Sequence, residues 1–368
     1  MRSRAALLIV LMMGMSVSSI AMADSTISSS TTWSGNVVLS GNVTVDASTT
    51  LVIESGTVVD AQSYWLQIDG TLEASDAQFM TTETSTSPGS TGAGLWGGIK
   101  ISSGGSAVLS NVSISGAESA LEVHGDATIH ESISIMNSYI GFDIGASGMV
   151  DAENVTMSTI DIQSVVNHGT LAIDTALITN TATGILSTND LTIDDVSFFE
   201  TGVAIDVVSG SADISRLGLE NVSVGIGSDS GASTAVTSIY GQHVSLLIDG
   251  TDADDLTVSN ALVSGDRLLW GSVESISLSD MNFTQENPGR SAIDLRCSVD
   301  CTFDNIYVHN ADIGIDVDGT GTTTLTESEI HADQLGLRAS GTGLLVMESS
   351  VLKANETAFS ISSVNTEL

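Results

Sequence analysis

Three acidic residues, Glu153, Asp174 and Asp194, recur at spacings of 21 and 20 residues, each directly after an apolar residue that begins a repeated segment. If the repeats stack as parallel strands about 4.8 Å apart, the three carboxylates form a column. Like charges at that distance raise the pKa of one member or recruit a cation. The column therefore predicts either a Ca²⁺ site or a paired-carboxylate hydrolytic site. A solvated acidic face is the alternative, since the chain holds 45 Asp and Glu.

A second set of charged residues follows the same period. Asp316 and Arg338 are 22 residues apart and are expected to pair across neighbouring repeats, and so are His309 and His331, which are expected to stack as surface histidines. An exposed ion pair contributes only about 0–1 kcal/mol. The other members of this second column are Asp143, Asp206 and Asp294.

The only two cysteines, Cys297 and Cys301, enclose three residues. An even number of cysteines in an oxidising compartment favours a disulfide, here one that closes a small loop. A free or metal-binding pair is the alternative.

The elements that must position these residues are repeats, clearest in residues 191–226. Apolar residues coincide there at a spacing of 21, as in Ile193 with Ile214 and Phe198 with Leu219. A fixed period near 20 indicates a solenoid, and alternation of apolar and polar residues within each copy is a strand period. The sequence therefore predicts an all-β right-handed parallel β-helix with coils of about 20–22 residues, its hand following that of parallel crossovers.

Twelve regular coils are expected from about residue 106, which makes a rod of roughly 58 Å. The only two prolines, Pro88 and Pro288, lie in polar insertions (83–94 and 284–291), where no ladder amide is lost. Asn or Asp recurs before the second short strand of many coils and predicts a structural corner. These corner residues are Asn111, Asn154, Asp195, Asn260, Asp280 and Asn305.

The chain begins with Arg2 and Arg4, an apolar run and Ala21-Met22-Ala23, which predicts a signal peptide over residues 1–23. We therefore expect a secreted or cell-surface protein that is not inserted in a membrane after cleavage. Residues 24–105 are expected to form amino-terminal coils and a cap, and residues 106–368 the regular coils. No polar cap is evident after the last coil, so we expect either a truncated sequence or an end-to-end partner there.

Charge restricts the partners. Removal of residues 1–23 leaves seven Lys and Arg against 45 Asp and Glu, a net charge of −38. Such a surface argues against nucleic acid, because phosphate binding needs a basic face. It favours divalent cations and tolerates a saline medium.

Several phrases in the amino-terminal part carry a family resemblance. Leu51-Val52-Ile53-Glu54-Ser55-Gly56-Thr57, Gly70-Thr71-Leu72 and Trp96-Gly97-Gly98-Ile99 follow one another in that order. The chain thereby resembles secreted right-handed parallel β-helix proteins of the pectin-lyase-like superfamily. The resemblance implies the fold and does not specify an activity.

The enzymes of that superfamily provide a test. Its lyases use a Lys or Arg base beside carboxylate-bound calcium, and its pectin hydrolases use three Asp residues with Gly-His-Gly and Arg-Ile-Lys phrases. Neither phrase occurs here; His124-Gly125-Asp126 and Asn167-His168-Gly169 are partial echoes. The mature arginines are scattered in the sequence. The four tryptophans, which favour core or end packing over sugar stacking, are Trp33, Trp65, Trp96 and Trp270.

The favoured hypothesis is accordingly a non-catalytic structural or adhesive rod that binds a polysaccharide or cell-surface glycan. In this hypothesis Ca²⁺ is the one cofactor considered. The alternative is a polysaccharide lyase or glycoside hydrolase that acts on an extracellular polysaccharide, with Glu153, Asp174 and Asp194 as its catalytic residues.

Overall fold

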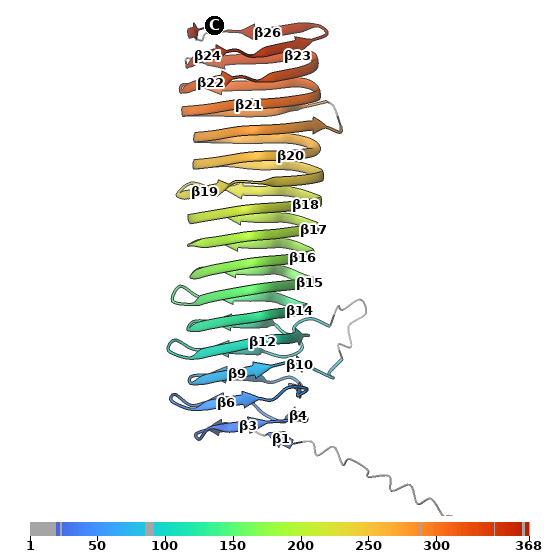
Figure 1. Ribbon diagram of the computed structural model, residues 1–368, viewed down its shortest axis with the longest axis vertical. Coiled ribbons are helices and arrows are strands. Elements are labelled where there is room, and N and C mark those ends of the chain that lie inside the picture. Colours follow the sequence, from blue (N-terminus) through green and yellow to red (C-terminus); the bar gives the residue numbers. More distant parts are fainter. Residues whose placement is uncertain are drawn as a thin grey trace, which may run out of the picture.

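The computed structural model describes residues 20–22, 24–84, 92–287, 289–341, 343–362 and 365–367. They form a right-handed parallel β-helix of about 15 turns, and none of them is helical. The coils follow one another along the long axis in sequence order (Figure 1). The predicted fold class is confirmed.

The strands are short in the first coils and longer afterwards. The first thirteen are β1 (Ile20–Met22), β2 (Ser25–Ile27), β3 (Thr31–Trp33), β4 (Asn36–Leu39), β5 (Val43–Val45), β6 (Thr50–Ile53), β7 (Val58–Asp60), β8 (Trp65–Ile68), β9 (Thr71–Ser75), β10 (Gln78–Met80), β11 (Gly98–Ile101), β12 (Ser106–Ser115) and β13 (Ser119–Val123). From there each strand runs around most of a coil. These strands are β14 (Asp126–Ile144), β15 (Met149–Asn167), β16 (Thr170–Ser187), β17 (Leu191–Val207), β18 (Gly210–Ser228), β19 (Ala232–Val236), β20 (Ile239–Gln285), β21 (Ser291–Gly319), β22 (Thr322–Thr326), β23 (Glu329–Gly341), β24 (Leu344–Glu348), β25 (Val351–Ala354), β26 (Thr357–Ile361) and β27 (Asn365–Glu367).

Each coil contributes to three parallel ladders, which we call faces A, B and C. Face A contains β2, β5, β8, β11, β13 and the last segments of β14 to β18. Face B contains β3, β6, β9 and the first segments of β12 and β14 to β18. Face C contains β4, β7, β10 and the middle segments that follow face B. The chain visits them in the order A, B, C.

The 21-residue spacing is the register of the ladder. Ile193 pairs with Ile214 and Phe198 with Leu219. Pairing is continuous across residue 106, where Leu72 on β9 aligns with Ala107 on β12. Side chains of aligned apolar residues stack inside the rod and exclude water.

The core is one continuous stack of aliphatic and phenyl groups. Phe142, Phe198, Phe283 and Phe303 have at most 1% of their surface exposed. Burying a side chain of this size stabilises the fold by roughly 1.5–3 kcal/mol. Trp33 and Trp96 also lie in the core, as expected, whereas Trp270 is 42% exposed.

The corners confirm the prediction in part. Asn111, Asn260, Asp280 and Asn305 have φ between 53° and 56°, the left-handed conformation that Asn and Asp tolerate. Asn154 lies at the same corner without positive φ, and its Nδ2 donates a hydrogen bond to the Glu131 carbonyl oxygen at 2.5 Å. Asp195 likewise lacks positive φ. A second row of positive-φ residues turns the chain from face C to face A. Its members include Asn137, Thr159, Asn180, Glu200 and Asn221.

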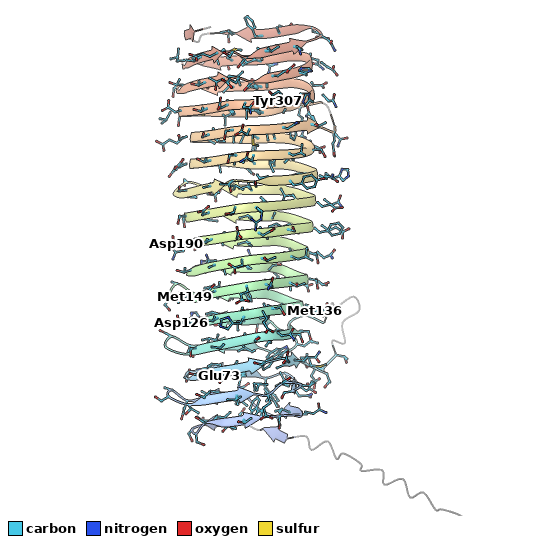
Figure 2. The ribbon with its side chains drawn as sticks, viewed as in Figure 1. Glu73, Asp126, Met136, Met149, Asp190 and Tyr307 are labelled. Atoms are coloured by element: carbon cyan, nitrogen blue, oxygen red, sulfur yellow. A yellow bond between two sulfur atoms is a disulfide. The ribbon has the colours of Figure 1, made fainter. Side chains whose placement is uncertain are left out.

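The corners project side chains along the edges of the rod. Asp126, Met149 and Asp190 lie along one edge and Met136 along the opposite edge (Figure 2). Cys297 and Cys301 form the predicted disulfide, with both residues buried and their Cα atoms 6.1 Å apart.

Some sequence predictions fall on residues outside the described ranges. The predicted signal peptide does so apart from β1, as do Pro88 and Pro288. In the ranges that are described, no helix has the length and apolarity needed to span a bilayer.

Candidate functional site

The predicted acidic column exists as a geometric feature. Asn154 aligns with Thr175 and Ile173 with Ile193, which places Glu153, Asp174 and Asp194 at equivalent positions on successive coils. All three side chains are exposed at the corner between faces B and C.

Two of these three acids already have partners. Glu153 lies 3.3 Å from His130 Nδ1 and accepts the backbone N–H of Glu131 at 2.9 Å, and these hydrogen bonds lower the pKa of Glu153. Asp194 accepts a hydrogen bond from Arg216 at 3.0 Å. Within the part of the chain that the structure describes, no three His, Cys, Asp or Glu residues are grouped so that they could hold a metal ion. The calcium and hydrolytic hypotheses for this column stay predictions.

The second predicted column lies on face A. Arg338 Nη1 donates to Asp316 Oδ2 at 2.8 Å, which confirms the predicted pair, and the rings of His309 and His331 stack edge to face at 5.4 Å. Asp143 and Asp206 lie further down the same column and are half-buried, unlike Glu153 and its neighbours.

The amino-terminal end of the face A column gathers a cluster that sequence reasoning missed. Lys100 on β11 aligns with Glu122 on β13, and Glu122 aligns with Asp143 on β14. The next position is Val166, which is only 8% exposed although it points outward. A cation and two carboxylates therefore stand on three successive coils beside a covered apolar side chain.

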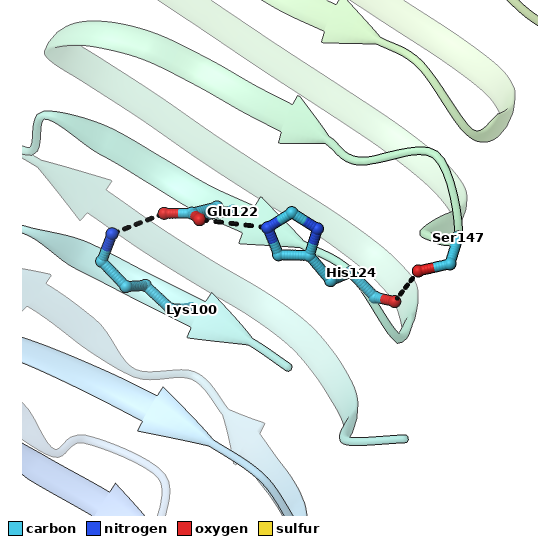
Figure 3. Close-up of polar contacts among 4 residues, drawn as sticks. All are labelled: Lys100, Glu122, His124 and Ser147. Atoms are coloured by element: carbon cyan, nitrogen blue, oxygen red, sulfur yellow. Dashed lines mark hydrogen bonds and ion pairs between the residues drawn. The ribbon is translucent and has the colours of Figure 1, made fainter. Parts of the chain in front are cut away.

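Glu122 is held from two sides (Figure 3). Lys100 Nζ donates to Glu122 Oε2 at 2.5 Å, and His124 Nε2 lies 3.1 Å from Glu122 Oε1. Ser147 Oγ in turn donates to the carbonyl oxygen of His124 at 2.8 Å. Both carboxylate oxygens of Glu122 are thus oriented before any ligand arrives.

Two glycines make this arrangement possible. Gly98 begins β11 with φ +82°, and a Cβ there would meet the carbonyl oxygen of Ser119 at 1.7 Å. A Cβ at Gly145 would meet His124 Nδ1 at 2.2 Å. Only glycine at these positions allows β11 to reach its register and the imidazole to lie over the next coil.

The two carboxyl groups differ in pKa. Burial opposes ionisation of Glu122, but the hydrogen bonds from Lys100 and His124 outweigh it and lower the pKa of Glu122. Burial raises the pKa of Asp143, and the negative charge of Glu122 raises it further, against the smaller opposing effects of His168, His124 and Lys100. Glu122 is the carboxylate of the pair and Asp143 is the group that keeps its proton to higher pH.

Such a split is the requirement for general acid–base chemistry by two carboxyl groups. Aligned positions on adjacent strands are about 4.8 Å apart, which is nearer to the roughly 5–5.5 Å of a retaining glycosidase than to the wider separation of an inverting one. Glu122 can attack or stabilise a cationic centre while Asp143 delivers a proton.

Comparison with known proteins is limited to structures. No family model matches the chain, and no curated protein matches it. The catalytic domain of a GH87 α-1,3-glucanase variant in complex with tetrasaccharides aligns with 12% identity and a TM-score of 0.31 over 94% of this chain. A family 28 exopolygalacturonase from Yersinia enterocolitica aligns with 12% identity and a TM-score of 0.25, covering 89% of this chain and 72% of that one. This chain spans 64% of the glucanase domain, less than two thirds of it. At these TM-scores the similarities assign no activity to this chain.

Proposed function

We propose that the protein is a secreted or cell-surface glycoside hydrolase that acts on a polysaccharide at the Glu122–Asp143 pair. The observation that carries the proposal is the opposed pKa shift of these two half-buried carboxyl groups on adjacent coils of face A. Three exposed acids on the corner column lack this burial, so the proposal moves the catalytic residues from Glu153, Asp174 and Asp194 to face A.

The proposed reaction has two steps. A Glu122 carboxylate oxygen attacks the anomeric carbon, the glycosidic C–O bond breaks, and Asp143 gives its proton to the departing oxygen. Asp143, now ionised, then takes a proton from water while the water oxygen displaces Glu122 from the anomeric carbon. Lys100 and His124 keep Glu122 ionised and oriented throughout. A retained anomeric configuration in the product is expected.

Hydrolysis is preferred to elimination for this cluster because Lys100 is engaged with Glu122. A lyase needs a free base to remove a carbon-bound proton, and a lysine that donates a hydrogen bond to a carboxylate at 2.5 Å is a protonated cation. The disulfide between Cys297 and Cys301 supports a location in an oxidising compartment, as secretion would provide.

The test is an assay for released reducing ends on a panel of neutral glucans and polyuronates. Glu122→Gln and Asp143→Asn should each reduce the rate by about 10²–10⁴-fold. Glu153→Gln and Asp174→Asn make the same chemical changes at exposed acids and should stay within twofold of the wild type. Melting temperatures confirm that all four variants fold.

Either of two results would overturn the proposal: a wild-type protein inactive on every polymer, or equal losses in the exposed-acid variants. The first would favour the non-catalytic glycan-binding rod. A specific feature already supports glycan binding as the second candidate function, namely the exposed Trp270 beside a hollow on face A.

A further inference from the structure

A hollow of about 860 Å³ opens on face A in the carboxyl-terminal half of the rod. It lies where residues 284–291 leave the regular coil. The side chains used below are Asp266, Arg267, Trp270, Arg290 and Asp294, all of which line the hollow.

The polar insertion that borders the hollow is anchored by its own side chains. Gln285 is 2% exposed, and its Nε2 donates to the carbonyl oxygens of Asp266 at 2.7 Å and Arg290 at 3.3 Å. Asn287 Nδ2 donates to Asp266 Oδ1 at 2.5 Å. These bonds fix Arg290 beside the preceding coil and occupy an oxygen of Asp266.

Two guanidinium groups converge on this hollow. The Arg267 side chain is 14% exposed, and its nearest carboxylate is Asp294 at 3.9 Å, too long for a hydrogen bond. Its Nε is buried with no hydrogen-bond partner among the residues that the structure describes. Burial lowers the pKa of Arg267; the charge of Asp294 opposes this effect and that of nearby Arg290 adds to it. A buried donor without an acceptor beside a second positive charge is a site short of an anion.

Trp270 supplies a flat apolar surface next to these donors. It aligns with Asp294 on the following coil and points outward, 42% exposed. An exposed indole ring that lies beside hydrogen-bonding groups can cover the C–H face of a pyranose.

We propose that this hollow binds an acidic sugar residue of a polysaccharide, with its ring on Trp270 and its carboxylate or sulfate group between Arg267 and Arg290. Guanidinium groups bind such planar or tetrahedral oxyanions through paired N–H donors. The site answers the charge argument from the sequence, because the fold brings together two arginines 23 residues apart on a chain of net charge −36.

The site is separate from the Glu122–Asp143 pair and does not depend on hydrolysis there. Between Asp143 and Trp270, the face A column holds Val166, Leu186, Asp206, Gly227 and Asp249. Six coil spacings at about 4.8 Å correspond to roughly 29 Å. A bound polymer that reached both sites would lie along the length of face A.

The test measures binding by quenching of tryptophan fluorescence and by calorimetry, using full-length protein with Asp143→Asn to prevent turnover. The probes are a uronic-acid oligosaccharide, a sulfated oligosaccharide and a neutral oligosaccharide of equal length. The acidic probes should bind, and the carboxylated and sulfated arms show which oxyanion fits better. Binding should weaken at least tenfold in Arg290→Gln and in Trp270→Ala, and the quenching should disappear in Trp270→Ala.

Arg216→Gln is the matched control, because it removes one positive charge from an exposed corner elsewhere on the rod. It should leave affinity within twofold. Equal weakening in this control, equal binding of the neutral probe or no binding of any acidic probe would overturn the proposal. Binding in the presence of an inactive wild-type enzyme would sustain it, so failure of the hydrolase proposal is a distinguishable result.

Discussion

Two columns of acids run along this rod with the same coil spacing and different surroundings. Glu153, Asp174 and Asp194 stand at the corner between faces B and C, where their side chains are exposed. Asp143 and Asp206 stand on face A, where they are half-buried and where burial is the largest cause of their raised pKa values. The repeat brings acids together in both places, but only face A removes them from water.

The reason lies in what flanks each column. A face A carboxylate lies flat between neighbouring coils: a Cβ at Gly227 would meet Asp206 Oδ1 at 2.8 Å. The corner acids instead project beyond the last backbone atoms of the turn. Proximity of like charges therefore counts for less here than desolvation, because water screens the corner and not the face.

Replacing Lys100 should give the largest change, because Lys100 holds the acid that water does not screen. Lys100→Met removes the cation that stabilises ionised Glu122, so the pKa of Glu122 rises and the acid limb of the rate profile moves to higher pH. A rate roughly tenfold below the wild type is expected on that limb, with a smaller loss at alkaline pH. Rates measured across pH on the best polymer substrate provide the check.

Lys353 is the matched control for this experiment, since it is the only other lysine and it pairs with Glu329, whose pKa its hydrogen bond helps to lower to about 2. Lys353→Met should leave the rate profile where it is. A profile unchanged in Lys100→Met would remove Glu122 from the mechanism.

The calcium hypothesis puts function back on the exposed column and is tested there. Binding at Glu153, Asp174 and Asp194 would stabilise the folded chain by about 1.4 kcal/mol at a calcium concentration ten times Kd. The melting temperature should then rise with calcium in the wild type and not in Asp174→Asn. A flat titration through millimolar calcium, or the same rise in both proteins, would retire the hypothesis.

Asp206 allows the desolvation argument to be tested through stability. Burial and the charges of Asp229 and Asp249 raise the pKa of Asp206 in the folded chain. Ionisation therefore disfavours folding: the free energy of unfolding is highest below the ordinary Asp pKa and falls as pH rises through the folded value. Asp206→Asn should stabilise the protein at pH 7 by up to about 1 kcal/mol after solvent screening, and should make no difference at acid pH.

Thermal unfolding at two pH values measures this effect. Asp174→Asn is the control, and its melting temperature should stay within about 1 °C of the wild type at both. Equal stabilisation by the two variants would mean that general charge repulsion, rather than burial on face A, governs the acids.

The sequence was sufficient to predict what the period alone determines. The ladder register, the Asp316–Arg338 pair and the stack of Glu153, Asp174 and Asp194 all follow from a spacing of 20–22 residues. Lys100 and Glu122 were missed because the polar insertion before Trp96 interrupts the period, so their membership of face A could not be counted. Arg267 and Arg290 were judged scattered for a similar reason: Gln285 folds the second insertion back onto its coil.

The smallest effect is expected at Arg216, which tests the exposed side of the comparison. Its guanidinium donates to Asp194 and Asp195 at 3.0 Å each, yet all three side chains are well exposed. Salt and water screen such pairs, so Arg216→Met should lower the melting temperature by less than about 2 °C, and by still less in 1 M salt. A drop of more than about 5 °C would show that the corner is energetically coupled to the core. The contrast between the columns would then need a cause other than access to water.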